Sequence, residues 1–247
     1  EGSLEARELR EAFATLVEKE REVITRERAF FADSSHVLRT PLAVLQGDIE
    51  QLEQGVYGKE RLEVVAQARH SLGTMSRAVN GLLLLAREHE VAPGSTWEVV
   101  ELGPLLERLV AEANVATPAL TLTARVAAPV DVAGDPHQLN DLFASLIENA
   151  CQYTPPGGAI DVTLKTGDPE NAIVEIRDTG IGLSTDDAAH AIERFYRGAA
   201  ARRMFPGGSG LGLAIAERIA RLHGGELTLR PAPGGGTIAR VTLPLLS

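Results

Sequence analysis

The sequence has 247 residues, of which 44% are hydrophobic and 23% charged, with a net charge of −10 and a single cysteine, Cys151. This length and balance predict one large or two ordinary globular domains with apolar cores. The negative charge argues against nucleic acid as a partner. One cysteine excludes a disulfide within this sequence and fits a reducing compartment.

No apolar stretch is long enough to cross a bilayer, because the longest runs only over residues 81–86. The sequence begins at Glu1, inside a charged helical pattern and without an initiator Met. We therefore expect a fragment of a longer protein, in which any membrane attachment belongs to an upstream segment.

Glycine and proline divide the sequence into two parts. Of the 13 prolines only Pro41 precedes Pro93, and glycine is scarce up to Val91. Residues 92–98 are therefore predicted to be a linker. The helical part is expected to comprise residues 1–28 and residues 29–91, and the second domain residues 99–247.

Apolar residues in the helical part recur at heptad spacing on both sides of a turn signal at residues 55–58. The seam residues are Phe31, Leu38, Leu42, Leu45, Ile49 and Leu52, then Leu62, Val65, Leu72, Met75, Val79, Leu82 and Ala86. Two helices joined by a tight turn lie antiparallel. One hairpin has too little surface to bury both seams, so we predict an all-α hairpin that dimerises into a four-helix bundle. Residues 1–28 continue the helical pattern, either as a signal-transmitting helix or as a solvated charged helix.

The second part alternates between the periods of strands and helices. Asp135, Pro136 and Gln138 form a helix-start signal. Strands are predicted at residues 97–102, 120–126, 159–166, 172–178, 226–230 and 237–243, and helices at 103–116, 136–153 and 211–222. A glycine-rich loop and an irregular segment are expected between residues 179 and 209. This order predicts an α/β two-layer sandwich with helices on one sheet face.

His36 follows the seam residue Ser35, so we expect its imidazole to point away from the bundle and to be largely neutral and nucleophilic at pH 7. The surrounding residues 30–42, FFADSSHVLRTPL, resemble the phospho-acceptor box of bacterial sensor histidine kinases. The resemblance implies that residues 29–91 form a dimerisation and histidine phosphotransfer domain. Its catalytic residues would be His36, Arg39 and Thr40, with Thr40 orienting a water that dephosphorylates a regulator.

Four motifs in the second part resemble, in order, the asparagine, first glycine, phenylalanine and second glycine boxes of the same family's Bergerat-type ATP-binding domain. They are LIENACQYTPPGG (146–158), RDTGIGLS (177–184), ERFYRG (193–198) and GGSGLGLAIAERIARLHGG (207–225). The resemblance implies that Asn149 is the Mg²⁺ ligand, that Asp178 accepts a hydrogen bond from the adenine amino group, and that Arg197 lies near the phosphates. The other nucleotide-binding residues that it implies are Tyr153, Gly180, Gly182, Gly208, Gly210, Leu211 and Gly212.

The implied protein is an ATP- and Mg²⁺-dependent histidine kinase. It would act as a homodimer, phosphorylate itself on His36 and pass the phosphoryl group to an aspartate of a response-regulator receiver domain. Phosphatase activity on that regulator is also implied. The sequence would be a cytoplasmic fragment of an inner-membrane protein.

Three residues depart from the family pattern. Val37 stands where an acidic residue usually accepts the imidazole proton, Ser145 where an asparagine is common, and Gln152 where a Lys or Arg is frequent. We therefore expect slow autophosphorylation and a balance that leans towards phosphatase activity. Two alternatives stay open: a gyrase- or chaperone-like ATPase that uses Glu148 as the water-activating acid, and a catalytically silent dimeric scaffold.

Overall fold

The structure is a computed structural model that describes residues 13, 34, 38–39, 42–55, 59–86, 97–167, 170–205 and 208–246. It divides into two compact units, residues 1–79 and 80–247, which we describe separately. This division lies inside helix α2 (Lys59–Ala86) and not at the predicted linker, of which residues 92–96 lie outside the described ranges. The predicted domain limits therefore stay a prediction.

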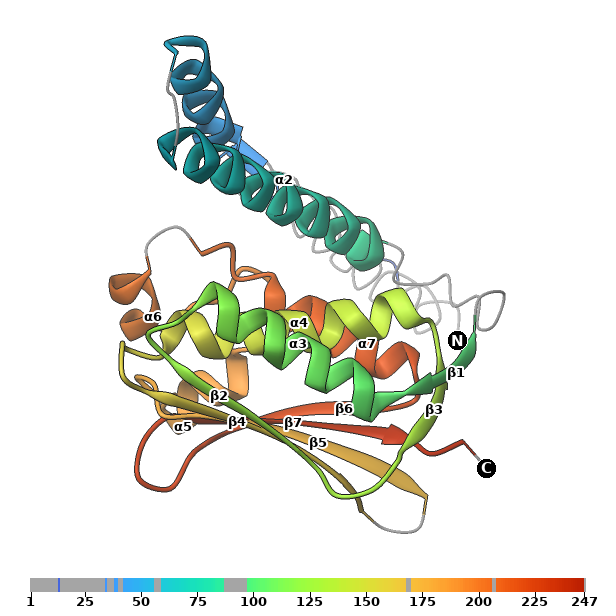
Figure 1. Cartoon of the computed structure of the whole chain (residues 1–247). Helices are drawn as coiled ribbons and strands as arrows, with labels where there is room; N and C mark the ends of the chain where they lie inside the picture. The colour runs from blue at the N-terminus through green and yellow to red at the C-terminus, as the bar shows by residue number, and fades with distance from the viewer. Residues whose placement is uncertain are drawn as a thin grey trace. The chain divides into compact units, whose positions relative to one another are not determined.

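The first unit contains a helical hairpin. Residues 42–53 are helical, a turn follows at Gln54 and Gly55, and α2 begins at Lys59. Gly55 has a φ of 85°, which glycine adopts without steric cost at a helix end. Figure 1 shows residues 42–53 lying beside α2, as the hairpin prediction requires. The predicted signal-transmitting helix lies outside the described residues, apart from the helical Phe13.

The second unit is an α/β domain whose elements mostly follow the predicted order (Figure 1). Its strands are β1 (Glu98–Glu101), β2 (Thr121–Val126), β3 (Asp131–Gly134), β4 (Ala159–Thr166), β5 (Asn171–Asp178), β6 (Glu226–Pro231) and β7 (Thr237–Pro244). Its helices are α3 (Leu102–Ala116), α4 (Pro136–Tyr153), α5 (Thr185–His190), α6 (Ala199–Met204) and α7 (Gly212–Leu222).

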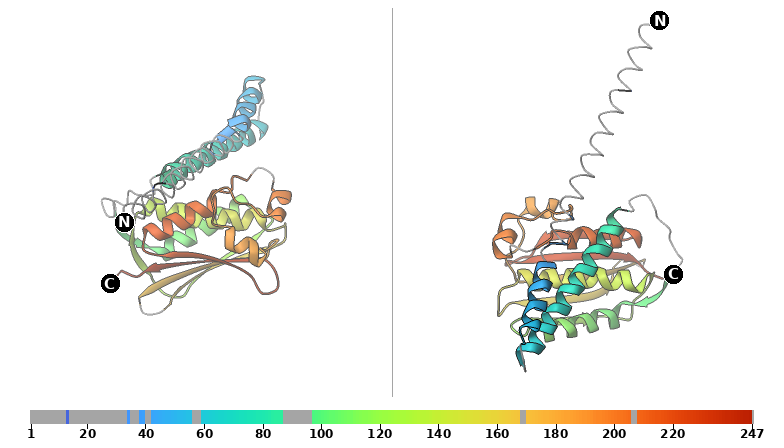
Figure 2. Two further views of the ribbon diagram at one scale, coloured as in Figure 1. Left: turned by 180° about the vertical axis from the view of Figure 1, so that it is seen from behind. Right: turned by 90° about the horizontal axis from the view of Figure 1, so that it is seen from above.

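Five strands form one mixed sheet in the order β2-β4-β5-β7-β6. The β2–β4 pair is parallel and the other three pairs are antiparallel. β1 and β3 form a separate antiparallel pair. Helices α3, α4 and α7 lie side by side over one face of the large sheet (Figures 1 and 2). The predicted two-layer α/β sandwich is therefore confirmed.

The core lies between the sheet and this helical layer. Strand residues alternate across the sheet, so Ile160, Val162 and Leu164 of β4 are buried while their neighbours are more exposed. Helix α4 supplies the facing surface from residues at helical spacing. Its buried residues are Leu139, Leu142, Phe143, Leu146, Ile147 and Ala150. Because α4 packs firmly through this face, its opposite face and its last turn can carry functional side chains.

Helix α4 begins as predicted. The Asp135 carboxylate accepts hydrogen bonds from the backbone N–H groups of His137 and Gln138, at 2.8 and 3.2 Å, and Pro136 occupies the first turn. The backbone N–H of Asp135 in turn donates to Nε2 of the buried His223, at 3.1 Å. The start of α4 is thereby fixed to the end of α7.

His223 satisfies both of its ring nitrogens in one tautomer. Nδ1 lies 2.8 Å from the carbonyl oxygen of Ile219 and must donate there, because Nε2 accepts from Asp135. The indole of Trp97, which immediately precedes β1, stacks on the imidazole with the ring centroids 5.4 Å apart and the planes 6° from parallel. The residue that leads into β1 is therefore tied to α4 and α7.

Three elements were not predicted. The segment between residues 179 and 209, expected to be irregular, contains the six-residue helices α5 and α6. Ser184 caps α5, since its Oγ accepts a hydrogen bond from the N–H of Asp187. Strand β3 was also missed, because its four residues gain their stability from pairing with β1 far away in the sequence.

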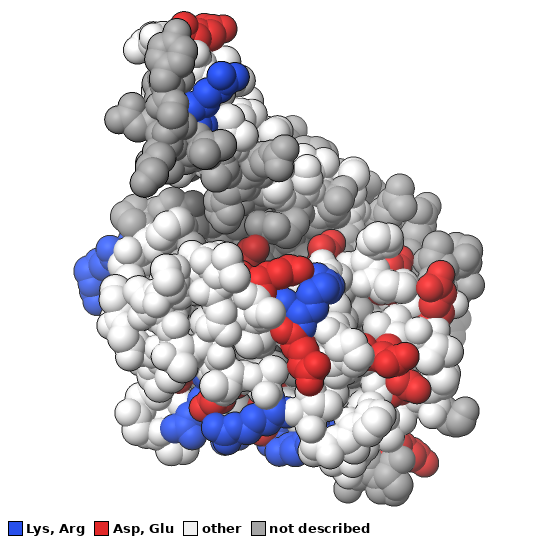
Figure 3. Space-filling model, viewed as in Figure 1, with Lys and Arg blue, Asp and Glu red and all other residues white. Residues whose placement is uncertain are grey.

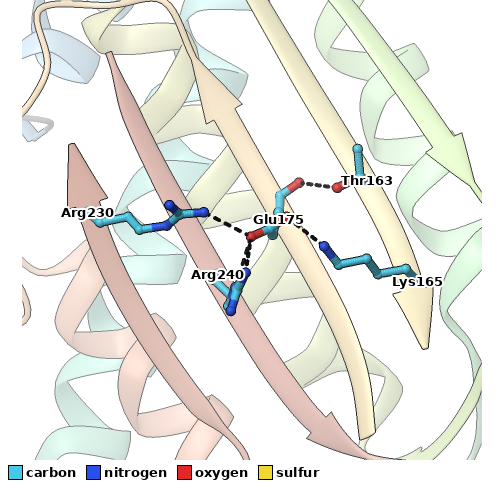
Figure 4. A network of polar contacts seen from close by, with 5 residues as sticks. All are labelled: Thr163, Lys165, Glu175, Arg230 and Arg240. Carbon is cyan, nitrogen blue, oxygen red and sulfur yellow. Dashed lines mark hydrogen bonds and ion pairs between the residues drawn. The ribbon is translucent and has the colours of Figure 1, made fainter. Parts of the chain in front are cut away.

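The open face of the sheet carries a charged network around Glu175 (Figure 4). Its carboxylate lies 2.7 Å from Nη2 of Arg240, 3.1 Å from Nζ of Lys165 and 3.4 Å from Nη2 of Arg230. Its backbone carbonyl accepts a hydrogen bond of 3.5 Å from Thr163. These residues lie on β4, β5, β6 and β7, so the network joins four neighbouring strands.

Acidic and basic side chains are interspersed on the molecular face shown in Figure 3, and the described residues form no continuous basic surface there. Within the described ranges, no helix is both long and apolar enough to span a membrane.

Candidate functional site

The predicted nucleotide-binding residues lie on three neighbouring segments of the second unit. Asn149 and Tyr153 belong to the end of α4, Asp178 ends β5, and the glycines of the second glycine box precede and begin α7. The loop after β5 contacts α4 directly, because the N–H of Ile181 donates to the carbonyl of Tyr153 at 3.1 Å. Motifs far apart in the sequence are thus brought together by the helical layer and one end of β5.

Asp178 is the buried carboxylate of the site, with a relative exposure of 6%. Its Oδ1 accepts hydrogen bonds from the backbone N–H groups of Gly180, at 2.8 Å, and Thr237, at 3.1 Å. Burial raises the pKa of this carboxyl, and the two N–H groups only partly oppose that effect. A buried, oriented acceptor of this kind suits a ligand that donates a hydrogen bond, such as an amino group on a base.

The backbones around Asp178 approach one another too closely for side chains. A Cβ on Gly180 would overlap the carbonyl of Tyr153, and one on Gly236 would overlap the carbonyl of Asp178. Gly182 has a φ of 73° and lies against Gly236. Gly236 was not among the predicted site residues, although the run of three glycines at residues 234–236 was its signal in the sequence.

The second glycine box meets the phenylalanine box through the backbone. The N–H of Phe195 donates to the carbonyl of Gly210 at 2.9 Å, and both residues have positive φ, 64° and 69°. A Cβ on Gly210 would come within 2.7 Å of the backbone of Phe195. The glycine is therefore required both for its own conformation and for this close contact.

Helix α7 begins at Gly212 without a side-chain capping bond from Leu211. The side chain of Leu211 is buried, with 1% exposed, so any contact with a nucleotide would come from its backbone. Uncapped N–H groups at the start of an eleven-residue helix suit an anion such as a triphosphate. Ser145, which departs from the family pattern, donates a 3.1 Å hydrogen bond to the carbonyl of Gly212 and so fixes this end of α7 to α4.

Asn149 is half-buried and could hold Mg²⁺ through its amide oxygen. Among the residues that the structure describes, no group of three or more His, Cys, Asp or Glu side chains could hold a metal ion. The single amide oxygen of Asn149 fits a magnesium ion that binds one protein oxygen and otherwise phosphate and water oxygens. The neighbouring Glu148 is exposed on the same helix.

Arg197 donates to backbone carbonyls of its own segment. Its guanidinium bonds the carbonyls of Ala201, at 3.0 Å, and Gly208, at 3.1 Å, and also that of Phe205. These bonds hold the residues around α6 together. The position of Arg197 near the phosphates stays a prediction, as do the roles of Tyr153, Gly180, Gly182 and Gly208.

The phospho-acceptor residues are only partly within the described structure. His36 and Thr40 lie outside the described residues, and so does Val37. Arg39 is helical and exposed. Their catalytic roles are therefore still predictions.

Family models match most of the sequence. Residues 26–90 match the model described as "His Kinase A (phospho-acceptor) domain". Residues 134–247 match "Histidine kinase-, DNA gyrase B-, and HSP90-like ATPase".

Named relatives agree with these matches. The signal transduction histidine-protein kinase BaeS of Escherichia coli K12 is 36% identical over 234 residues, which cover 94% of this chain and 49% of BaeS. The sensor histidine kinase RppB of Synechocystis is 33% identical and is matched over 90% of this chain and 50% of its own length. The chain thus spans about half the length of these relatives.

Two solved structures are similar to this one. The mycobacterial sensor histidine kinase MprB is 30% identical, with a TM-score of 0.54 over 60% of this chain and 97% of that structure. The Acinetobacter baumannii histidine kinase AdeS has a TM-score of 0.60 over 86% of this chain and 98% of its own; at 20% identity it supports the fold alone. With an ordered set of ATP-site motifs behind a matched phospho-acceptor domain, this chain belongs to the sensor histidine kinase family of two-component systems.

Proposed function

We propose that this chain is the catalytic core of a sensor histidine kinase, which transfers the γ-phosphoryl group of ATP to His36 and from there to an aspartate of a response-regulator receiver domain. The buried carboxylate of Asp178 carries the proposal, because two backbone N–H groups hold it at the end of β5 beside a glycine loop. That position suits an adenine amino group, and the uncapped start of α7 suits the phosphates.

In the proposed transfer, the bond between the γ-phosphorus and the bridging oxygen of ADP breaks, a bond to an imidazole nitrogen of His36 forms, and the imidazole loses a proton. The chain's residues contribute mainly position: Asp178 orients the base, and the first N–H groups of α7 receive the phosphate charge. Asn149 would hold Mg²⁺, which when bound neutralises phosphate charge.

The chain is proposed to act as a homodimer. Several residues of the predicted seams are exposed in the single chain, which supports the idea that a second copy covers them. Their exposed fractions are 43% for Leu42, 46% for Ile49, 51% for Leu72 and 40% for Val79. A monomer measured by sedimentation at micromolar concentration would contradict the dimer.

The function is tested by incubating the chain with γ-labelled ATP and Mg²⁺ beside a His36→Gln variant. We expect label that is stable in base, labile in acid and absent from the variant. Addition of a receiver domain should then remove the label from the chain. Nucleotide binding without any label would contradict the autokinase.

A phosphatase-biased or silent scaffold is the second candidate, and Val37 and Gln152 favour it. Gln152 is half-buried near the end of α4 and brings no positive charge there. Loss of phosphate from a phosphorylated receiver domain, without autophosphorylation, would identify the phosphatase, with Thr40→Ala as the control. No phosphoryl transfer in either direction would identify the scaffold.

The gyrase- or chaperone-like ATPase is opposed by the phospho-acceptor domain in front of the ATP-binding domain. Steady ATP hydrolysis that depends on Glu148 and not on His36 would restore it. Attachment of the full protein to the inner membrane is a separate proposal that rests on the family resemblance, and fractionation of cells that express the full protein tests it.

A further inference from the structure

The carboxylate of Asp187 joins two segments of the chain beside the predicted nucleotide site. Oδ2 of Asp187 accepts a 2.7 Å hydrogen bond from the hydroxyl of Ser184, which caps α5. Oδ1 of the same residue accepts a 2.9 Å hydrogen bond from the phenol of Tyr196. Asp187 therefore ties α5, directly behind the first glycine box, to the phenylalanine box.

Both hydrogen bonds favour the ionised carboxylate. The Ser184 hydroxyl and then the Tyr196 phenol hold the pKa of Asp187 below its usual value, and the bond to Asp187 raises the pKa of Tyr196. At neutral pH a neutral phenol thus donates to a charged carboxylate. Such charge-assisted hydrogen bonds are stronger than those between neutral groups.

The start of α6 lies against the same carboxylate. A Cβ on Gly198, the residue that precedes α6, would come within 2.6 Å of Oδ1 of Asp187. A side chain at this position would therefore have to displace the carboxylate that accepts the Tyr196 bond. Asp187 therefore locates both Tyr196 and the first residue of the turn into α6.

The residue before Tyr196 is held in a costly conformation. Phe195 has a φ of 64°, in the left-handed region that non-glycine residues rarely adopt. Its N–H bonds the carbonyl of Gly210 in front of α7, at 2.9 Å. A conformation of this kind persists only where neighbouring contacts enforce it. The Tyr196–Asp187 bond holds the residue that follows Phe195.

We propose that Asp187 and Tyr196 form a latch that positions the lid segment, defined here as residues 195–205, beside the nucleotide site before nucleotide binds. Both are positioning residues and need not touch the ligand. Arg197 fixes carbonyls within the lid segment, whereas the latch ties that segment to α5. The consequence for nucleotide affinity rests on the proposed ATP-binding function: a lid segment that is already ordered costs less entropy when the nucleotide binds.

Tyr196→Phe removes only the phenol hydroxyl and so tests the latch in the whole chain. The first measurement is limited trypsin cleavage after the exposed Arg202 and Arg203 in nucleotide-free protein, which reports opening of α6. The second is the Kd of a non-hydrolysable ATP analogue with Mg²⁺. We expect the rate of cleavage and the Kd each to rise about threefold to tenfold, which is the usual range for the loss of one hydrogen bond.

Two variants separate the latch from a general loss of α5. Asp187→Asn keeps an acceptor for Tyr196 and should give a smaller effect than Tyr196→Phe. Ser184→Ala removes the α5 cap and the Ser184 bond to Asp187, but it keeps the Tyr196 hydroxyl and its acceptor. Its cleavage rate at Arg202 and Arg203 should therefore stay closer to that of the unsubstituted chain than the rate in Tyr196→Phe. Equal cleavage in Ser184→Ala and Tyr196→Phe would overturn the latch, because α5 stability would explain both.

The outcomes also separate the latch from the proposed function. Unchanged cleavage in Tyr196→Phe overturns the latch, and faster cleavage with an unchanged Kd overturns its role in nucleotide binding. If the unsubstituted chain binds no nucleotide, the proposed function fails, while the cleavage comparison still decides whether the latch exists.

Discussion

The carbonyl oxygen of Asp178 occupies the space that a Cβ on Gly236 would need, so the end of β5 and the turn between β6 and β7 meet backbone to backbone. The amide that follows Gly236, the N–H of Thr237, bonds the Asp178 side chain at 3.1 Å. The position of the buried carboxylate therefore depends on a glycine that was not among the predicted site residues.

Gly236→Ala should displace this turn and weaken nucleotide binding. Gly234→Ala is the matched control, because Gly234 has a φ of 86° against 89° for Gly236 but has no atom within 4 Å of its Cβ position. We expect Gly234→Ala to lower the free energy of unfolding by about 1 kcal/mol through backbone strain alone. Gly236→Ala should cost about 3 kcal/mol because the clash adds to that strain. Equal costs in urea unfolding would contradict the contact.

Asp178→Asn should separate stability from binding. An asparagine keeps an oxygen that accepts hydrogen bonds from the N–H groups of Gly180 and Thr237. It also removes the buried negative charge of Asp178, whose burial raises the pKa of that carboxyl. The free energy of unfolding at pH 7 should therefore not fall. Affinity for ATP should drop about tenfold to a hundredfold, because an amide N–H₂ would face the adenine amino group. Calorimetric titration measures the affinity.

The same variant has a definite pH dependence. Because the folded-state pKa of Asp178 is raised, the folded chain binds a proton more readily than the unfolded chain. The unfavourable contribution of Asp178 is thus fully present at neutral pH and shrinks as the pH falls through the raised pKa. The free energy of unfolding of Asp178→Asn, relative to that of the unsubstituted chain, should therefore decrease in acid. An increase instead would contradict the raised pKa of Asp178.

Glu175→Gln tests the charged network on the open face of the sheet. Burial alone would raise the pKa of Glu175, but Arg240 and Lys165 outweigh it and hold that pKa below its usual value. The network's contribution is therefore present at neutral pH and lost as the pH falls through the lowered pKa. We expect Glu175→Gln to lower the free energy of unfolding at pH 7 by about 1 kcal/mol.

The control is Glu112→Gln, which breaks a single 2.9 Å pair with Arg108 on the surface of α3. Glu112 is 60% exposed at its side chain and Glu175 only 17%. The Glu112 change should cost about 0.3 kcal/mol. If both variants lower the free energy of unfolding in urea by the same amount, the network around Glu175 stabilises the fold no more than an ordinary surface ion pair.

Val37→Glu should raise the rate at which phospho-histidine forms. A carboxylate next to His36 could accept the imidazole proton, and proton acceptors of this kind contribute about a hundredfold or more in favourable cases. The initial rate with γ-labelled ATP measures the change, and the double variant with His36→Gln shows that the label is on that histidine. A rate equal to that of the unsubstituted chain would remove the argument that Val37 makes this kinase slow.

The strands and long helices were predictable because the periodicity of apolar residues within each segment specifies them. Burial alternates along β4, which was predicted with its observed limits, residues 159–166. The start of α4 was predictable from the capping residue Asp135. β3 is only four residues long, and its partner β1 precedes it by a whole helix, so no local pattern marks it. Ser184 and Asp187 are residue types that favour a helix start, but the six residues of α5 are too few to show a helical burial pattern.

The candidate site was predictable as a set of motifs but not as a set of contacts. Asn149, Asp178 and the glycines before α7 were recognised from resemblance, and the structure brings their segments together. The bond between Tyr196 and Asp187 and the close approach of Gly236 to Asp178 depend on how separate segments meet. Nothing in the spacing of these residues along the chain specifies those pairs.

Trp97 is the only tryptophan in the sequence, and it stacks on a histidine that α4 and α7 share. Both helices carry predicted nucleotide-site residues at their other ends. By helical rise, Asn149 lies about 20 Å from Asp135 along α4. The indole therefore gives this chain an intrinsic fluorescent probe at the ends of α4 and α7 that lie away from the predicted nucleotide site. A change in its emission on adding nucleotide would report a movement of the two helices themselves.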